Sequence, residues 1–351
     1  MRRTWATALV LAALGCSPSS AGPTDAGPRD TGPPDAGPGW QVVFDGRTLT
    51  RDLLSVWGTS PSDVYAVGGP LGNAGYEAIV LHFDGSAWHE LPPGGTDSFW
   101  WVYGSGPTDV WMVGEKGRIT HWDGTSFVEV APRLTTATLY GVWAASPTDA
   151  WAVGGTPEGG TAAPNDIVLH WDGTAWSPSP LPMALGRTLF KVWGTSSADL
   201  YAVGEAATVW HRAGTTWTLS PALAHGTLFT VFGCSASEVY VIGGRDLLRS
   251  DGTTWSAVPI TLFNDANGVG CAAPGAAAID GFGGLKQRLV QGSWVDDSTA
   301  APLADLHSVW ADSGGAYWVA GGDFVAPSQP NKPRAGALAR YGMGSVPTVI
   351  Q

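Results

Sequence analysis

The sequence predicts an all-β chain that folds as a seven-bladed β-propeller, and three observations favour this fold class. The phrase "VWGTSPSDVYAVGG" at Val56–Gly69 returns as "VYGSGPTDVWMVGE" at Val102–Glu115 and as "VWAASPTDAWAVGG" at Val142–Gly155. Copies of this phrase recur about every 42 residues, a spacing typical of propeller blades. Only 14% of the residues are charged, whereas 49 Gly and 26 Pro supply the tight turns that many short strands require.

Each copy begins with a triplet of valine, an aromatic residue and a small residue. One of the seven copies is strongly altered. The triplets are Val56-Trp57-Gly58, Val102-Tyr103-Gly104, Val142-Trp143-Ala144, Val192-Trp193-Gly194, Val231-Phe232-Gly233, the altered Gly268-Val269-Gly270, and Val309-Trp310-Ala311. Within the first copy, alternating runs at 53–58, 63–68, 78–83 and 87–91 predict four short strands, with Asp84-Gly85 as a tight hairpin between the last two. Four strands per repeat make one blade.

The ring is predicted to close by pairing its two ends. The seventh copy supplies three strands and then ends without the fourth strand that begins with tryptophan in other copies. The segment "GWQVVFDG" at Gly39–Gly46 fits that missing strand. We therefore expect residues 40–44 to pair with 337–341, which makes 40–345 the propeller and 346–351 a C-terminal tail.

The N-terminus carries an export signal. Residues 1–16 combine a basic start with an apolar run of about ten residues, too short to span a bilayer. The ending "ALGC" resembles the lipobox of bacterial lipoproteins, with Ala13 at the position where leucine is usual. This resemblance implies cleavage before Cys16, which would become the lipid-modified N-terminus; a soluble secreted protein remains the alternative.

A low-complexity segment follows the signal. Residues 17–39 repeat Gly, Pro and Asp with a five-residue period and cannot bury a core, so they predict a disordered tether of roughly 70 Å when extended. Ser17, rather than Asp, follows Cys16, which favours the outer membrane as the anchoring site. The expected location is therefore the cell envelope, with contact to the membrane through the lipid alone, facing either the periplasm or the outside.

The third-to-fourth strand segments, such as "VLHFDGSAW" and "VLHWDGTAW", resemble those of Asp-box and WD-repeat-like propellers of exported bacterial proteins. The resemblance covers residues 40–342 and implies the fold. It departs from both families, because Asp-boxes separate Asp and Gly by one residue and WD repeats contain a Gly-His pair that these segments lack. Asp-box propellers include sialidases and other glycan-active enzymes, while other relatives bind or act as scaffolds, so no activity follows from the resemblance.

Several polar residues recur at equivalent positions, which favours structural roles. Four histidines occupy one strand position in successive blades: His82, His121, His170 and His211. Metal ligands must converge on one point, whereas equivalent positions in a ring are spread around it, so we predict hydrogen bonds, no metal and no cofactor. The acidic residues that begin second strands, such as Asp63 and Asp109, are expected to cap their own turns. Tryptophans that begin fourth strands are expected to fill the gaps between blades.

The two remaining cysteines predict a disulfide. Cys234 and Cys271 occupy the same blade position, one blade apart. Equivalent points on neighbouring innermost strands lie about 6 Å apart, within reach of a disulfide. This bond would link the strongly altered sixth repeat to the fifth.

The candidate binding face is the one that carries the connections between second and third strands. These connections are long in repeats 1, 3 and 7, at 68–78, 154–166 and 321–336. The candidate residues are Tyr76, Asp166, Phe324 and Lys332 in these loops, and the irregular pair Trp100 and Trp101. The alternatives are drift of tolerated loops and, for the tryptophans, ordinary core packing.

We expect a non-enzymatic binding or scaffold module for an envelope protein or glycan. The net charge of −12, with 18 scattered Lys and Arg, argues against nucleic-acid binding. No GxSxG motif and no non-repeated acid–base cluster is apparent, so no catalytic residue is assigned. The alternatives are a glycan-active enzyme, such as a sialidase or another glycosidase or lyase, on the same face, and a structural envelope component without a specific ligand.

Overall fold

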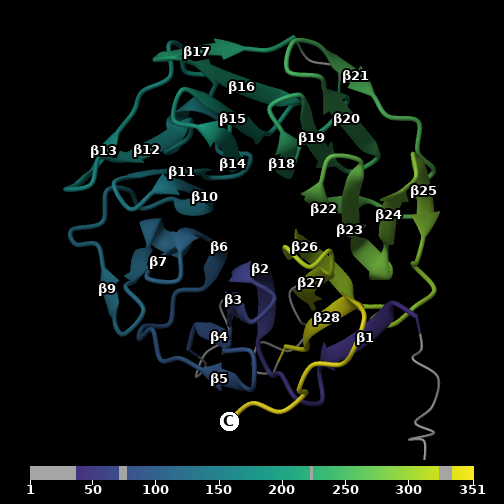
Figure 1. Ribbon diagram of the computed structural model, residues 1–351. Helices are drawn as coiled ribbons and strands as arrows, with labels where there is room; N and C mark the ends of the chain where they lie inside the picture. The colour runs from purple at the N-terminus through teal and green to yellow at the C-terminus, as the bar shows by residue number, and fades with distance from the viewer. Residues whose placement is uncertain (1–36, 71–76, 222–223, 324–333) are drawn as a thin grey trace, which may run out of the picture. The chain divides into compact units, whose positions relative to one another are not determined.

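The computed structural model describes residues 37–70, 77–221, 224–323 and 334–351 and shows a ring of seven antiparallel sheets (Figure 1). Each sheet has four strands, and the innermost strands surround the central axis. The seven-bladed β-propeller predicted from the repeats is therefore confirmed. Within these residues, no helix has the length and apolar character required to cross a membrane.

The first four blades follow the chain in order, from the inner strand to the outer strand. Blade 1 contains β2 (Asp52–Ser60), β3 (Asp63–Gly69), β4 (Ile79–Phe83) and β5 (Trp88–Glu90). Blade 2 contains β6 (Phe99–Gly106), β7 (Asp109–Gly114), β8 (Ile119–Trp122) and β9 (Phe127–Glu129). Blade 3 contains β10 (Thr138–Ser146), β11 (Asp149–Gly155), β12 (Ile167–Trp171) and β13 (Trp176–Pro178). Blade 4 contains β14 (Leu189–Ser196), β15 (Asp199–Gly204), β16 (Thr208–Ala213) and β17 (Thr216–Leu219).

The last three blades complete the ring. Blade 5 contains β18 (Thr230–Ser235), β19 (Glu238–Gly243), β20 (Asp246–Ser250) and β21 (Trp255–Ala257). Blade 6 contains β22 (Ala266–Ala273), β23 (Ala276–Gly281), β24 (Lys286–Val290) and β25 (Ser293–Asp296). Blade 7 contains β26 (Asp305–Ala311), β27 (Tyr317–Gly322), β28 (Gly336–Gly342) and, as its outer strand, β1 (Gly39–Phe44). Three short 3-10 turns lie between second and third strands: η1 (Glu115–Gly117), η2 (Gly160–Ala162) and η3 (Phe282–Gly284).

Blade 7 closes the ring as the sequence predicted. Strand β1 pairs antiparallel with β28, with Trp40 opposite Tyr341 and Phe44 opposite Leu338. Phe44 is buried and contacts the Trp88 ring edge-on at a centroid distance of 5.5 Å. The N-terminal strand thus completes blade 7 and also packs against blade 1, so the closure is stabilised by hydrogen bonds and by apolar burial.

The repeated triplet packs neighbouring inner strands against each other. Its aromatic ring lies over the small residue of the next blade: a Cβ on Gly104 would lie 2.9 Å from the Trp57 ring, and one on Gly58 would lie 2.9 Å from the Trp310 ring. Trp57 and Trp310 are both more than 90% buried. The aromatic and the glycine are therefore two halves of one contact between blades, which explains why they recur together.

A second set of contacts fills the wider gaps between the outer parts of the blades, as predicted for the fourth-strand tryptophans. Each ring meets an aromatic ring on the second strand of the preceding blade. The pairs are Trp88–Trp318 at 5.9 Å, Trp176–Trp111 at 5.2 Å, Trp217–Trp151 at 6.1 Å, Trp255–Tyr201 at 5.7 Å and Trp294–Tyr240 at 6.5 Å. All are edge-on, the geometry that ring quadrupoles favour.

The C-terminal tail, residues 346–351, returns to blade 1. The backbone amide of Gln351 donates to the carbonyl of Trp88 at 2.8 Å, and Ile350 forms a parallel bridge with Trp88. The side-chain amide of Gln41 exchanges two hydrogen bonds with the backbone of Val346. Figure 1 accordingly shows the C-terminus beside β5. The tail therefore covers the junction between blades 7 and 1.

The disulfide between Cys234 and Cys271 is confirmed. It joins β18 to β22, with a Cα–Cα distance of 5.3 Å and a sequence separation of 37 positions. The bond links the innermost strands of blades 5 and 6. The pairing corrects the expected alignment by one residue: in blade 6, Gly270 takes the aromatic position and Cys271 the small-residue position, whereas Cys234 follows the small residue Gly233 of blade 5. The disulfide therefore supports an interface in which glycine has replaced the aromatic ring.

Candidate functional site

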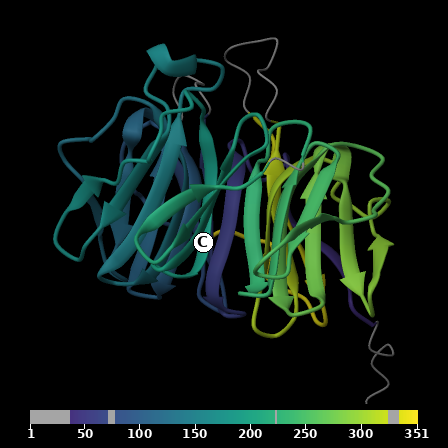
Figure 2. The ribbon, with the colours of Figure 1, turned by 90° about the horizontal axis from the view of Figure 1, so that it is seen from above.

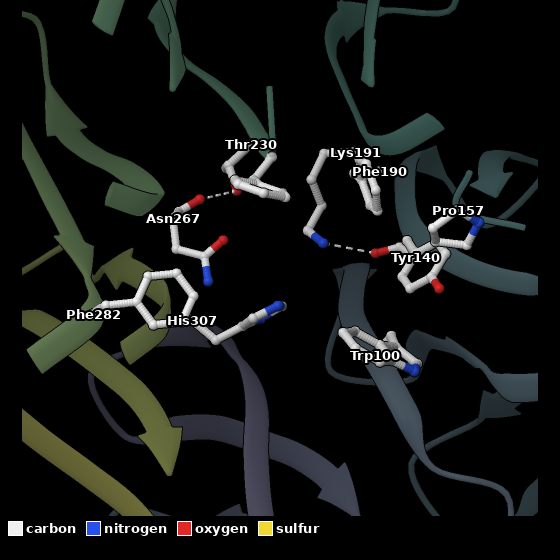
Figure 3. A pocket seen from close by; sticks show the side chains of 10 residues that line it. Trp100, Tyr140, Pro157, Phe190, Lys191, Thr230, Asn267, Phe282 and His307 are labelled. Atoms are coloured by element: carbon white, nitrogen blue, oxygen red, sulfur yellow. Dashed lines mark hydrogen bonds between the residues drawn. The ribbon is translucent and has the colours of Figure 1, made fainter. Parts of the chain in front are cut away.

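A pocket of about 250 Å³ opens at one end of the central axis, where the inner strands begin. Blades 2 to 7 contribute one or two side chains each from nearly equivalent positions, and two connecting segments complete the wall. The lining residues are Trp100, Tyr140, Pro157, Phe190, Lys191, Phe229, Thr230, Asn267, Phe282 and His307 (Figure 3). The propeller fold therefore converts one repeated strand position into a ring of side chains around a cavity.

A β-bulge at the start of the inner strands directs five of these side chains to the axis, namely Trp100, Tyr140, Phe190, Asn267 and His307. In six blades the pairing between the first and second strands skips one residue, as between Phe99 and Trp101 or between Leu189 and Lys191. The skipped residues are Leu54, Trp100, Tyr140, Phe190, Asn267 and His307. A bulged residue has no cross-strand partner and its side chain is re-aimed, so these positions are available to line the pocket.

Four of these side chains and Phe229 form a continuous aromatic arc. The ring centroids are 5.6 Å apart for His307–Trp100, 4.9 Å for Trp100–Tyr140, 5.1 Å for Tyr140–Phe190 and 5.5 Å for Phe190–Phe229. The rings are tilted or edge-on to one another, so each restricts its neighbours. We call these five residues the aromatic arc. They give the pocket a rigid and predominantly apolar wall.

Lys191 brings a buried amine into this apolar wall. Its side chain is almost fully buried, its Nζ donates to the carbonyl of Tyr140 at 2.8 Å, and the same atom lies 4.1 Å from the centroid of the Trp101 ring. Burial lowers the pKa of Lys191 to about 7, because the charged form loses its hydration. The side chain points towards the middle of the cavity in Figure 3.

Blades 5, 6 and 7 make one side of the pocket more polar. The Thr230 hydroxyl donates to the carbonyl of Asn267 at 2.7 Å, which fixes the start of β22 beside β18. In Figure 3 the Asn267 amide and the His307 ring face the cavity. His307 Nδ1 lies 2.6 Å from the carbonyl of Leu54. Burial and the nearby positive charge of Lys191 lower the pKa of His307 to about 3, so the ring is neutral at physiological pH.

The pocket opens on the face that the sequence predicted to be decorated. Each second strand runs antiparallel to its inner strand, so the connection to the third strand emerges at the end where the inner strand begins. Pro157 from the β11–β12 connection and Phe282 from η3 reach the pocket rim. Figure 2 shows η2 of the β11–β12 connection standing above the strands at this end. We call this end the long-loop face.

The residues predicted for the binding face do not all lie at the pocket. Trp100 lines the pocket, whereas Trp101 is buried beneath Lys191 and supports it. Asp166 lies outside the pocket: its Oδ2 accepts from the backbone amides of Leu185 and Gly186 at 2.9 and 2.6 Å, which ties two connections of blades 3 and 4 together. Tyr76, Phe324 and Lys332 lie outside the described residues.

Sequence reasoning missed most of the pocket. The predicted residues do not include Tyr140, Phe190, Lys191, Phe229, Asn267 or His307, all of which line the pocket. The available signal was the position two residues before the valine of each inner strand, where the copies differ most in chemistry. Interpreting that difference requires the bulge, because a regular strand would direct these side chains into the sheet interface.

The recurring histidines form structural clusters, as predicted, but their aspartates do not simply cap turns. Nε2 of each histidine contacts a carboxylate oxygen of the aspartate at the start of the second strand: His82–Asp63 at 2.7 Å, His121–Asp109 at 2.8 Å, His170–Asp149 at 3.0 Å and His211–Asp199 at 2.8 Å. In three blades a first-strand hydroxyl, from Thr59, Ser105 or Thr195, donates to the same aspartate. The carboxylate therefore links three strands, which is a correction to the turn-capping expectation.

These clusters have the composition of a catalytic triad but a different geometry. Ser105 and His121 both bond to Asp109, so the hydroxyl contacts the carboxylate and not the imidazole that would have to accept its proton. Burial alone would raise the pKa of Asp109, but the hydrogen bonds from His121 and Ser105 outweigh it and hold the pKa below its usual value. Among the residues that the structure describes, no group of three or more His, Cys, Asp or Glu side chains is arranged to bind a metal ion.

Comparisons with known proteins support the fold alone. No family model matches the sequence, and no curated protein matches it significantly. Among solved structures, the chain is similar to YCF48 bound to D1 peptide, with a TM-score of 0.63 and 16% identity over 87% of this chain and 97% of that one. It is also similar to a streptogramin B lyase, with a TM-score of 0.68 and 13% identity over 86% and 97%. The WD40 propeller domain of Doa1 aligns with a TM-score of 0.62 and 10% identity over 86% and 97%.

Proposed function

We propose that this protein is a non-enzymatic binding module of the cell envelope, anchored by a lipid on Cys16, and that it binds a segment of a partner protein at the central pocket on its long-loop face. The aromatic arc carries this proposal. It presents five adjoining rings in a cavity large enough for one side chain, and ligand sites are characteristically concave, mostly apolar and equipped with a few polar groups.

A protein partner is favoured over a glycan by the chemistry of the wall. Six of the ten lining residues have aromatic rings, and four of these six are phenylalanine or tryptophan. Phenylalanine and tryptophan rings form favourable contacts with an apolar side chain. A similar propeller, YCF48, was solved bound to a D1 peptide, which supports a peptide as the ligand. The connections at the pocket rim extend the surface with which a bound segment can form further contacts.

The proposal is tested by photo-crosslinking in cells that express the protein. A photoreactive phenylalanine analogue at Pro157, on the pocket rim, is expected to crosslink one protein reproducibly, and Phe190→Ala should reduce this product at least fivefold. The matched control places the same analogue at Thr148, in the β10–β11 turn at the opposite end of the blade.

A product that forms equally from Thr148, or that is unaffected by Phe190→Ala, would contradict the proposal. Crosslinking to a glycan instead of a protein would show that the ligand of the pocket is a glycan and not a peptide. Release of a cleaved glycan fragment by the purified protein would establish the glycan-active alternative and overturn the non-enzymatic assignment.

A further inference from the structure

The central pocket contains a cationic side chain that the described structure leaves without a counter-ion. Lys191 donates to one carbonyl, that of Tyr140, although an ammonium group has three N–H donors. Within the described residues no carboxylate forms an ion pair with it, and burial is the cause of its shifted pKa. A buried lysine of this kind costs stability, because its charge is removed from water without an opposite charge in return.

The shape of the pocket places this amine beside an apolar space of limited size. An apolar cavity of roughly 150 Å³ is sufficient to bind benzene. The pocket here has a volume of about 250 Å³. Four rings of the aromatic arc, those of Trp100, Tyr140, Phe190 and Phe229, follow one side. The Asn267 amide and the neutral His307 ring, at the end of the arc, face the cavity from blades 6 and 7 (Figure 3). The site is therefore divided into an apolar wall and a polar region whose N–H donors are the Asn267 amide and the Lys191 amine, because the neutral His307 ring already donates its one N–H to the carbonyl of Leu54.

We infer that the pocket takes a carboxylate carried on a compact apolar body of about ten heavy atoms, with the Lys191 ammonium as its counter-ion. This inference rests on the proposed function and specifies which part of a partner the pocket holds. A free aromatic acid and the C-terminal residue of a peptide both present this chemistry. In either case the ring contacts the aromatic arc and the carboxylate accepts hydrogen bonds from Lys191.

Binding must be coupled to protonation of Lys191. With a pKa of about 7, the amine of the free protein is mostly neutral at pH 8. A bound carboxylate stabilises the ammonium form, so binding at pH 8 takes up about 0.9 proton from the buffer, and binding at pH 6 takes up about 0.1. The groups that face Lys191 do not compete in this range: His307 stays neutral with a pKa of about 3, and burial raises the pKa of Tyr140 above its usual value. In blade 6, burial raises the pKa of Asp280 to about 8, and the neighbouring charge that acts on this carboxyl is that of Lys286, not that of Lys191.

The first experiment is calorimetric titration of the purified protein with 3-phenylpropionate and with its neutral amide. We expect the acid to bind at least tenfold more tightly than the amide at pH 6, and about tenfold more weakly at pH 8 than at pH 6. Titrations at pH 8 in two buffers of different ionisation enthalpy measure the proton uptake. This measurement uses the unaltered protein, so it does not depend on the folding of a variant.

Two lysine variants identify the group responsible. Lys191→Met retains the length of the side chain without its charge and is expected to lose the preference for acid over amide. Lys116→Met is the matched control, because it removes the same charge from an exposed side chain, 72% accessible, in the β7–β8 connection on the long-loop face. It should bind the acid like the unaltered protein.

The source of the carboxylate is distinguished by a five-residue peptide that ends in phenylalanine, with a free or an amidated C-terminus. Tighter binding of the free-carboxylate peptide than of 3-phenylpropionate assigns a chain end, and the reverse assigns a small acid. Equal binding of acid and amide, no proton uptake at pH 8, or a preference that survives in Lys191→Met would each overturn the inference. The proposed function would still stand if the crosslink from Pro157 remained sensitive to Phe190→Ala but not to Lys191→Met.

Discussion

Removal of the disulfide between blades 5 and 6 is expected to lower the stability of the propeller by about 4 kcal/mol. Cys234 and Cys271 have a sequence separation of 37 positions. In the chain-entropy model, a crosslink that closes a loop of this length removes about 13 cal/mol/K from the unfolded chain, which corresponds to about 4 kcal/mol at 25 °C. Because the unfolding entropy of a chain of this size is roughly 0.6 to 0.7 kcal/mol per degree, the unfolding midpoint should fall by about 6 °C.

The assay compares thermal unfolding, followed by calorimetry and tryptophan fluorescence, for three samples. These are the oxidised protein, the reduced protein, and the double variant Cys234→Ala with Cys271→Ala. The reduced protein and the double variant should unfold within about 2 °C of each other, because both lose the same crosslink. Cys16→Ser is the control and should unfold like the oxidised protein. An unchanged midpoint in the reduced protein would refute the crosslink argument, and a fall confined to the double variant would assign the effect to lost packing.

Three further predictions concern the closure, a buried carboxyl and the anchor. Phe44→Ala should cost about 3 to 5 kcal/mol in urea denaturation, because the ring is buried between β28 and Trp88; a cost below 1 kcal/mol would show that β1 is dispensable for closure. Burial raises the pKa of Asp280 to about 8, so its contribution to stability is complete below roughly pH 4 and is lost as the pH rises towards 8. Asp280→Asn should therefore flatten the decline in stability between about pH 5 and 8, and an unchanged decline would assign it to other groups. Cys16→Ser should move the protein from the membrane fraction to the soluble fraction and abolish the mass increment of the lipid, whereas a soluble unaltered protein would contradict the anchor.

The fold could be predicted from the sequence because the residues that form the contacts between blades recur in successive repeats. An aromatic residue and a glycine recur together in the triplet because each aromatic ring packs on the next blade, as Trp57 does on Gly104. Closure could also be predicted, since a missing strand at one end matched a spare strand at the other, and Phe44 indeed lies opposite Leu338. Repetition thus made the long-range pairing accessible from local patterns.

The site could be predicted only in part because it depends on a local irregularity. The face was indicated by the long connections, and Trp100 by its departure from the other copies. Trp101, the next residue, appeared equivalent in the sequence but is buried under Lys191. The bulge separates these two neighbours, and no residue type in the strand specifies it. Asp166 was selected for its place in a long loop, although it lies outside the pocket and one oxygen of its carboxylate accepts from two backbone amides.

The bulge also explains how a repetitive fold can carry a directional site. Residues paired in the ladder are constrained by packing between blades, so their chemistry repeats around the ring. A bulged residue is released from pairing, and its substitution changes the cavity with little effect on the sheet. The six blades with a bulge differ in the residue they place there: Trp100, Tyr140 and Phe190 make one side of the pocket apolar, whereas Asn267 and His307 make the other side polar. A ligand with one apolar and one polar end would therefore enter this nearly symmetric ring in a single orientation.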